Sequence, residues 1–253
     1  MGPRLPFIAT CAATALAVWT CLCGSAQAGG AACLARSAAT VPAVVELYTS
    51  EGCSSCPPAD RWLSRWQADP AVVALAFHVD YWDSLGWKDP HASAVYTQRQ
   101  AQQQRSSGAR FSYTPQVLVD GVDRPDWPGW IPRPARPASH VTVELARQGR
   151  QVQGRIVALP GAPARLAAYW AVTEQGHVSD VHAGENAGAT LHHDAVVTDY
   201  RPVAPWVATA GGTALALDYA LPGEADPRHP RTVSLVVIDA DLARPVQAVQ
   251  LGC

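Results

Sequence analysis

The sequence predicts an α/β domain followed by an antiparallel β-sandwich-like region. In the first half of the chain, apolar β-branched runs alternate with segments of helical period, whereas the second half contains about seven short alternating runs separated by Gly and Pro. Alternating strands and helices are typical of an α/β unit, and evenly spaced short strands are typical of a sandwich. We therefore expect domains over residues 29–123 and 140–253, joined by a Pro- and Trp-rich linker over residues 124–139.

Residues 1–28 have the pattern of a secretory signal peptide. A basic residue, Arg4, precedes an apolar stretch that ends in Ala26-Gln27-Ala28, and such segments are removed after export. A retained membrane anchor is the alternative. No later segment has the roughly 18 consecutive apolar residues of a membrane helix. We expect a periplasmic or secreted protein with no membrane span after cleavage.

Four of the seven cysteines follow the signal-like segment, namely Cys33, Cys53, Cys56 and Cys253. An even number of cysteines in an oxidising compartment favours disulfides. Because the ends of a domain often lie close together, we expect the pairs Cys33–Cys253 and Cys53–Cys56. Four cysteines allow three connectivities, and unpaired thiols are a further alternative.

Charge and glycine spacing exclude two classes of partner. The net charge is −2, so the chain has no basic footprint for nucleic acid. The glycines of “GENAG” (residues 184–188) lack the spacing of a phosphate-binding loop. We expect no nucleic-acid partner and no cofactor.

The first half begins with an apolar run over residues 43–50 that predicts a buried strand. A helix is predicted to begin between Cys53 and Pro57, because apolar residues then recur at helical spacing and prolines are tolerated in a first helical turn. The next elements are predicted over residues 71–82 (strand), 93–105 (helix) and 115–121 (strand), the last ending in the hairpin-forming pair Asp-Gly.

The pair Cys53 and Cys56 lies where the first strand meets the first helix. Unpaired amides and the helix dipole stabilise a thiolate at such a position, and one helical turn separates the two sulfurs. A structural zinc site needs two further ligands, and the sequence has no second Cys-x-x-Cys. The pattern therefore favours a redox dithiol, and the two serines between the cysteines contribute little to that choice.

The sequence around the dithiol resembles the active-site region of glutaredoxins and thioredoxins. “VELYTSEGCSSC” is similar to their first strand and active-site turn, and Thr114-Pro115 falls where those proteins have a cis-proline beside the dithiol. The resemblance implies a thioredoxin-like (glutaredoxin-like) fold over residues 29–123, with Thr114 and Pro115 docking the substrate. The chain departs from it at Gly52, where a tryptophan is usual, and at Leu47, where a buried acid is usual.

Four segments resemble a family of secreted bacterial proteins, domain-of-unknown-function family 1223. They are “VVELYTSEGCSSCPPAD”, “HVDYWDSLGWKD”, “YTPQVLVDG” and “GENAGATL”. The resemblance covers nearly the whole chain after the signal-like segment. It implies a thioredoxin-like fold and no assigned reaction.

Several polar residues are candidates for the rest of the site. Glu46 is our candidate for the carboxylate that takes the proton of Cys56, unless it is a solvent-exposed residue at the strand end. Asp80, Trp82 and Tyr113 are expected to line a substrate groove at the edge where open α/β sheets place their sites. The alternative for Asp80 and Trp82 is a loop that covers the sheet edge.

Histidines are the remaining candidate ligands. His78 lies within an apolar run and is expected to be a core residue with a satisfied hydrogen bond. His177, His182 and “HHD” (residues 192–194) form no closed ligand set in the sequence, so we expect no metal site.

These patterns together predict an exported thiol–disulfide oxidoreductase. Cys53 would attack a protein or small-molecule disulfide, and Cys56 would resolve the mixed disulfide. Two alternatives remain. One is a non-catalytic thioredoxin-fold binding module with a permanently closed Cys53–Cys56 bond, and the other is a Cu(I)-handling protein with His78 as a third ligand.

Overall fold

The computed structural model describes residues 1–2, 33–107, 111–132, 135–208, 214–224 and 226–253. All but two residues of the predicted signal peptide lie outside the described residues. The chain divides into two units, residues 1–31 and 32–253, and the description below concerns the second unit.

The described residues form fourteen strands, two α-helices and two short 3₁₀ helices. The strands of the first half are β1 (Cys33–Arg36), β2 (Ala43–Thr49), β3 (Val72–His78), β4 (Gln116–Val119) and β5 (Val122–Asp123). Those of the second half are β6 (Val141–Gln148), β7 (Gln151–Ala158), β8 (Arg165–Glu174), β9 (His177–Asp180), β10 (Thr190–His193), β11 (Val196–Val207), β12 (Ala214–Ala220), β13 (Arg231–Asp239) and β14 (Arg244–Leu251). The helices are α1 (Pro57–Ser64), η1 (Asp83–Leu85), α2 (Ala94–Ser107) and η2 (Trp127–Gly129).

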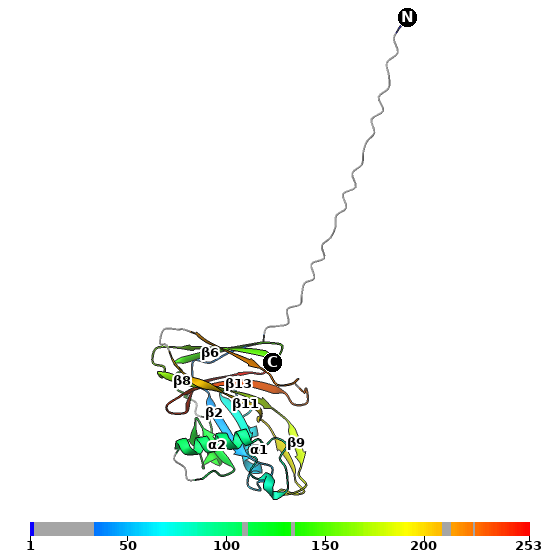
Figure 1. Cartoon of the computed structure of the whole chain (residues 1–253), viewed down its shortest axis with the longest axis vertical. Helices are drawn as coiled ribbons and strands as arrows, with labels where there is room; N and C mark the ends of the chain where they lie inside the picture. Colours follow the sequence, from blue (N-terminus) through cyan, green and yellow to red (C-terminus); the bar gives the residue numbers. More distant parts are fainter. Residues whose placement is uncertain (3–32, 108–110, 133–134, 209–213, 225) are drawn as a thin grey trace. The chain divides into compact units, whose positions relative to one another are not determined.

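The described strands form three sheets. An eight-stranded sheet has the order β14-β13-β8-β11-β3-β2-β4-β5, a four-stranded sheet has the order β1-β6-β7-β12, and β9 and β10 form a separate hairpin. In the large sheet β3 is parallel to β2 and β11. Its other pairs are antiparallel. Figure 1 shows β6 of the smaller sheet above β8 and β13, with α1 and α2 beside β2.

The predicted fold class, an α/β thioredoxin-like domain followed by a β-sandwich-like region, is wrong. The described residues are mostly strand, with only two α-helices. The parallel strands β2 and β3 do not form an α/β sheet of their own, because β11 pairs with β3 on one side and with β8 on the other. Three further strands of the second half, β8, β13 and β14, thereby continue the same sheet.

The two larger sheets pack face to face through an apolar core. Trp170 of β8 and Leu235 of β13 are buried there against β6 and β7, and Trp170 stacks on Tyr219 of β12 with ring centroids 5.2 Å apart. Gly154 of β7 lies against them. A Cβ there would stand 2.9 Å from Leu235 Cδ2 and 3.0 Å from Trp170 Cη2, so the close approach of the sheets requires glycine.

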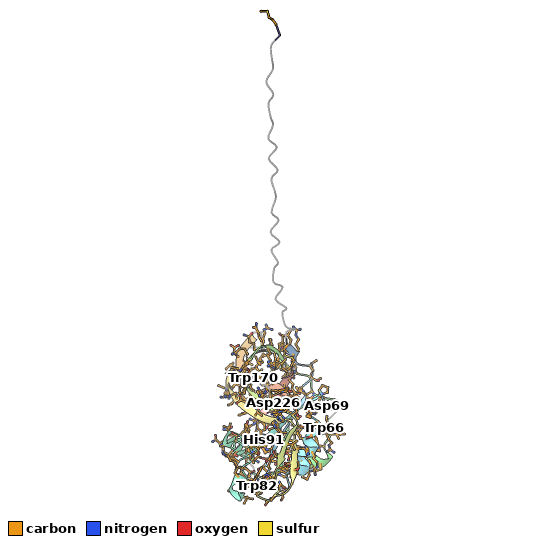
Figure 2. All side chains as sticks on the ribbon, turned by 90° about the vertical axis from the view of Figure 1, so that its right-hand side faces the viewer. Trp66, Asp69, Trp82, His91, Trp170 and Asp226 are labelled. Atoms are coloured by element: carbon orange, nitrogen blue, oxygen red, sulfur yellow. A yellow bond between two sulfur atoms is a disulfide. The ribbon has the colours of Figure 1, made fainter. Side chains whose placement is uncertain are left out.

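The helices cover the other end of the large sheet, one on each face. Along β2, Val45 and Leu47 pack toward α1, whereas Val44 and Tyr48 belong to the core that contains Tyr96 of α2. This alternation follows from the two-residue period of a strand. Figure 2 places Trp82 at the end of this unit away from Trp170, so the loop that carries Trp82 lies apart from the sheet–sheet core.

The segment predicted as a linker packs on α1. Trp127 and Trp130 contact Trp62 edge-on, with ring centroids 5.5 and 5.9 Å away. Trp66 joins the same cluster. Among the residues that the structure describes, no helix has the length and hydropathy needed to cross a bilayer.

Candidate functional site

The centre of the candidate site is a disulfide between Cys53 and Cys56, whose Cα atoms are 5.4 Å apart. Cys56 is the N-cap of α1, and Pro57 and Pro58 occupy the first two helical positions. Cys53 is 1% exposed and Cys56 0% exposed. A second disulfide joins Cys33 in β1 to Cys253.

Each serine of the Cys-Ser-Ser-Cys turn has a defined contact. Ser55 Oγ lies 3.3 Å from Cys53 Sγ. A thiolate accepts but does not donate hydrogen bonds, so the Ser55 hydroxyl is placed to donate to Cys53 after reduction. Ser54 donates from its backbone N–H and its hydroxyl to Glu185 Oε2, at 2.9 and 2.8 Å.

The Thr114–Pro115 peptide bond is cis and is connected to the dithiol turn through Trp82. It precedes Gln116, whose Cα pairs with Tyr48 at the end of β2. The Trp82 indole N–H donates to Thr114 Oγ1 at 2.8 Å. Trp82 also lies against Gly52, where a Cβ would stand 2.9 Å from the Trp82 Cβ. Trp82 therefore connects Thr114 to the residue before Cys53, and only glycine fits under it.

Asp80 and Tyr113, the other two predicted groove residues, make their hydrogen bonds elsewhere. Asp80 Oδ1 accepts from the Thr97 hydroxyl of α2 at 2.6 Å. The Tyr113 hydroxyl donates to Asp123 of β5 at 2.8 Å. Both residues hold loops in place, whereas Trp82 contacts the turn.

Glu46 lies on the α2 face of the sheet, opposite the face that Leu47 presents to α1. Arg99 of α2 forms an ion pair with it, and the Tyr169 hydroxyl of β8 donates to Glu46 Oε1 at 2.6 Å. Arg99 also donates to the Tyr200 hydroxyl of β11 at 2.7 Å. The structure therefore builds Glu46 into a buried ion pair and does not bring it to the dithiol.

Asp60 is a buried carboxyl residue on the helix whose N-cap is Cys56. It lies one helical turn after Cys56 on α1, and its backbone N–H donates to the Cys56 carbonyl at 3.1 Å. Thr49 Oγ1 donates to Asp60 Oδ2 at 3.2 Å. Burial raises the pKa of Asp60, and the nearby His193 and His78 only partly offset this rise. The sequence signal for Asp60 was its i+4 spacing from Cys56.

Five histidines from separate segments form a cluster beside this carboxyl. Neighbouring ring centroids are 4.9 Å apart for His78–His193, 5.3 Å for His78–His91, 4.6 Å for His91–His177 and 4.0 Å for His177–His229. We call these residues the histidine cluster. His91 lies in the middle of it, between the two ends of the unit in Figure 2.

The inner end of the cluster is anchored by Asp89. His78 Nδ1 lies 2.7 Å from Asp89 Oδ2, and both side chains are fully buried. Burial alone would lower the pKa of His78, but the Asp89 carboxylate raises it, and His78 in turn lowers the pKa of Asp89. Burial and the neighbouring His78 lower the pKa of His91 to about 4. His78 is thus the paired core histidine that its sequence context predicts.

Glu51 connects the cluster to the dithiol turn. Its Oε1 lies 3.3 Å from His193 Nε2, and the Trp87 indole N–H donates to its Oε2 at 2.7 Å. Burial opposes ionisation of Glu51, but the nearby His193 and Ser179 and the hydrogen bond from Trp87 lower its pKa. The turn that carries Cys53 therefore has an ionised carboxylate on its inner side.

The β9–β10 hairpin reaches over the turn. Asn186 donates from Nδ2 to the carbonyls of Glu51 and Cys53, at 2.8 and 3.0 Å, and Glu185 accepts the two bonds from Ser54 described above. We call residues 184–188 the hairpin tip. The hairpin pairs with no other strand that the structure describes, so these contacts and those of its base hold it in place.

The described side chains contain no group of three or more His, Cys, Asp or Glu arranged to hold a metal ion. The histidines considered as ligands from the sequence are in different surroundings. His177 and His193 belong to the histidine cluster, His182 contacts Trp87 edge-on at 5.7 Å, and His192 is exposed on β10.

Comparison with known proteins gives a family and a fold. A family model described as “Protein of unknown function (DUF1223)” matches residues 44–238. The crystal structure of protein AGR_C_4864 from Agrobacterium tumefaciens is similar with a TM-score of 0.61 and 27% identity, over 85% of this chain and 96% of that one. HBP35 of Porphyromonas gingivalis is similar with a TM-score of 0.54 and 13% identity, over 85% of this chain and 76% of that one. A search of curated proteins found no match.

Proposed function

The chain belongs to the DUF1223 family, and from the geometry of its dithiol turn we propose that it is an exported thiol–disulfide oxidoreductase. The observation that carries this proposal is the Cys53–Cys56 disulfide at the start of α1, with the Asp60 carboxyl one turn further along the same helix. The two disulfides and the signal-like segment support a place in an oxidising compartment.

The chemistry uses the residues of the turn in two steps. In the reduced protein, the Cys53 thiolate attacks a substrate disulfide and releases one substrate thiolate, leaving a mixed disulfide on Cys53. Asp60 then takes the proton of the Cys56 thiol, and the Cys56 thiolate attacks Cys53 Sγ. The second substrate thiolate leaves, so the substrate has gained two electrons and the dithiol has lost them.

The residues around the turn serve this cycle. The Ser55 hydroxyl is placed to stabilise the Cys53 thiolate, and Trp82 with Thr114 forms a wall beside it. Pro57 and Pro58 leave two helical positions without N–H donors, which increases the importance of the Ser55 contact. We transfer the proton-acceptor role from Glu46 to Asp60, because Arg99 and Tyr169 already hold Glu46.

Steady-state turnover tests the proposal. The purified protein is given dithiothreitol as reductant and glutathione disulfide or a disulfide-containing peptide as substrate, with Cys53→Ser and Cys56→Ser alongside. We expect turnover well above the uncatalysed rate, with at least a 100-fold loss in Cys53→Ser. Cys56→Ser should accumulate a mixed disulfide on Cys53, detected as an added substrate mass. A wild-type rate equal to the uncatalysed rate would reject the proposal.

The burial of both sulfurs favours a second candidate, a binding module with a permanently closed Cys53–Cys56 bond. With 1% and 0% exposure, neither sulfur can be attacked without movement of the covering residues. The same assay separates the two candidates, because a permanent disulfide resists dithiothreitol in the folded protein. Asp89 already engages the Nδ1 of His78, so we do not propose the Cu(I) alternative.

A further inference from the structure

A small cavity lies between α1 and β10 and reaches Asp60. Its volume is about 70 Å³, and its walls are formed by Pro57, Asp60, Arg61, Thr190, Leu191, His192 and His193. A water molecule takes about 30 Å³ in the liquid, so the cavity has room for roughly two. The cavity therefore connects the buried Asp60 to the polar side chains of β10.

His193 is the buried base on the wall of this cavity. Its side chain is 2% exposed, and its Nδ1 makes no hydrogen bond with any residue that the structure describes. Its Nε2 lies 3.3 Å from Glu51 Oε1, so a carboxylate lies beside the ring. A neutral imidazole accepts a proton at one nitrogen and donates from the other.

The proposed reaction leaves one proton on Asp60 in each cycle. That proton must leave before Asp60 can accept the next one, and Asp60 itself is only 7% exposed. We propose that His193 is the proton-relay residue that carries this proton from Asp60 through the cavity toward solvent. The inference rests on the proposed function and adds the path of its proton.

Several charged and titratable groups lie near His193. Those of the body are Glu51, Asp60, Arg61, His78 and His91, with Asp89 paired to His78, and those of its own hairpin and its base are His177, His192 and Asp194. The exposed His192 also lines the cavity.

The test is the pH profile of turnover in His193→Gln and His193→Ala, with dithiothreitol and glutathione disulfide. Glutamine fills a similar volume but does not titrate. We therefore expect a 10- to 100-fold lower turnover rate. The part of the pH profile that depends on His193 should also disappear. Added imidazole should raise the rate of His193→Ala several-fold. His140→Ala, at an exposed histidine that is not part of the cavity wall, should stay within about twofold of wild type and not respond to imidazole.

A double variant connects the relay to Asp60. If His193 acts through Asp60, Asp60→Asn with His193→Gln is no slower than Asp60→Asn alone. A wild-type pH profile in His193→Gln, or no rescue of folded His193→Ala by imidazole, overturns the relay while the oxidoreductase proposal stands. Absence of turnover in the wild-type protein overturns both.

Discussion

At the scale of single residues, the two serines between the cysteines are more important than their sequence context indicates. Ser55 contacts the Cys53 sulfur, and Ser54 is held by Glu185 from a segment 131 residues away. A shift of one position along β2 also decides which face of the sheet a carboxylate occupies. Glu46 and Leu47 are neighbours on β2, so they point to opposite faces, and Glu46 faces Arg99 of α2 and not α1.

Asp60→Asn should make the folded protein more stable at pH 7 and change it little near pH 4. Burial raises the pKa of Asp60, so the folded state favours the protonated form. That contribution is fully present below the ordinary pKa of about 4 and is lost as pH rises through the raised value. Asparagine stays neutral and can still accept from Thr49. Thermal unfolding followed by circular dichroism at both pH values measures the difference.

The control for this prediction is Asp218→Asn on β12, whose carboxyl is exposed. It should change the free energy of unfolding by no more than about 0.5 kcal/mol at either pH. An Asp60→Asn variant that is less stable than the wild type at pH 7 would contradict the prediction.

At the scale of elements, the β9–β10 hairpin is the part that sequence patterns did not reveal. Its strands have a two-residue burial alternation, but the buried positions of β10 are Leu191 and His193, so the hydrophobic period is weak. The hairpin begins after Gly176, with a φ of +70°, and ends before Ala195, with a φ of +54°. The residues that flank the hairpin thus have left-handed backbone conformations. These conformations let the chain turn sharply into and out of the hairpin.

Asn186→Ala should speed reduction of the Cys53–Cys56 bond. The variant loses the two hydrogen bonds from the hairpin tip to the turn, each worth about 1 kcal/mol or a factor of about five. We expect a 5- to 30-fold higher rate of reduction by a water-soluble phosphine, measured as loss of the disulfide by alkylation and mass spectrometry. Val178→Ala, at an exposed position of β9, should react at the wild-type rate. Equal rates for the two variants would show that the tip does not limit access.

At the scale of the whole molecule, the two halves of the chain share one sheet and one buried ion pair. Val196 of β11 pairs with Ala76 of β3, and the Glu46–Arg99 pair is completed by hydroxyls from β8 and β11. The Cys33–Cys253 disulfide adds a covalent connection between β1 and Cys253, two residues beyond the end of β14. The halves therefore depend on each other for pairing, charge neutralisation and cross-linking.

Replacing Cys33 and Cys253 by serine should cost about 2–5 kcal/mol of unfolding free energy. The bond closes a loop with a sequence separation of 220, whereas Cys53–Cys56 has a separation of 3, and the entropy removed from the unfolded chain grows with loop length. Guanidinium denaturation measures both variants. A Cys53→Ser/Cys56→Ser variant that loses as much stability as Cys33→Ser/Cys253→Ser would contradict this account.

Local patterns predicted the elements, whereas long-range pairing decided the fold. The strands over 43–49, 72–78 and 116–119, the helix over 94–107 and the seven runs of the second half all correspond to observed elements. The partners of β3 could not be read from its sequence, because an apolar run carries no information about which distant strand lies beside it. In the site, the cysteines, Trp82 and Pro115 were predicted from local motifs. Asp60 follows Cys56 by one helical turn, whereas His193 and Asn186 meet the turn only after tertiary folding.

The shared sheet has a consequence for any attempt to cut the protein into parts. A fragment that ends at residue 139 would contain the whole dithiol turn. The edge of β3 that pairs with β11 would, however, have no partner strand. The Glu46–Arg99 pair would lose its hydrogen bonds with the hydroxyls of Tyr169 and Tyr200. The two charged side chains would then lie in a core that is covered on one side only. An unpaired apolar strand edge recruits other chains. Such a fragment should therefore aggregate when made alone and recover its fold when residues 140–253 are supplied as a separate chain.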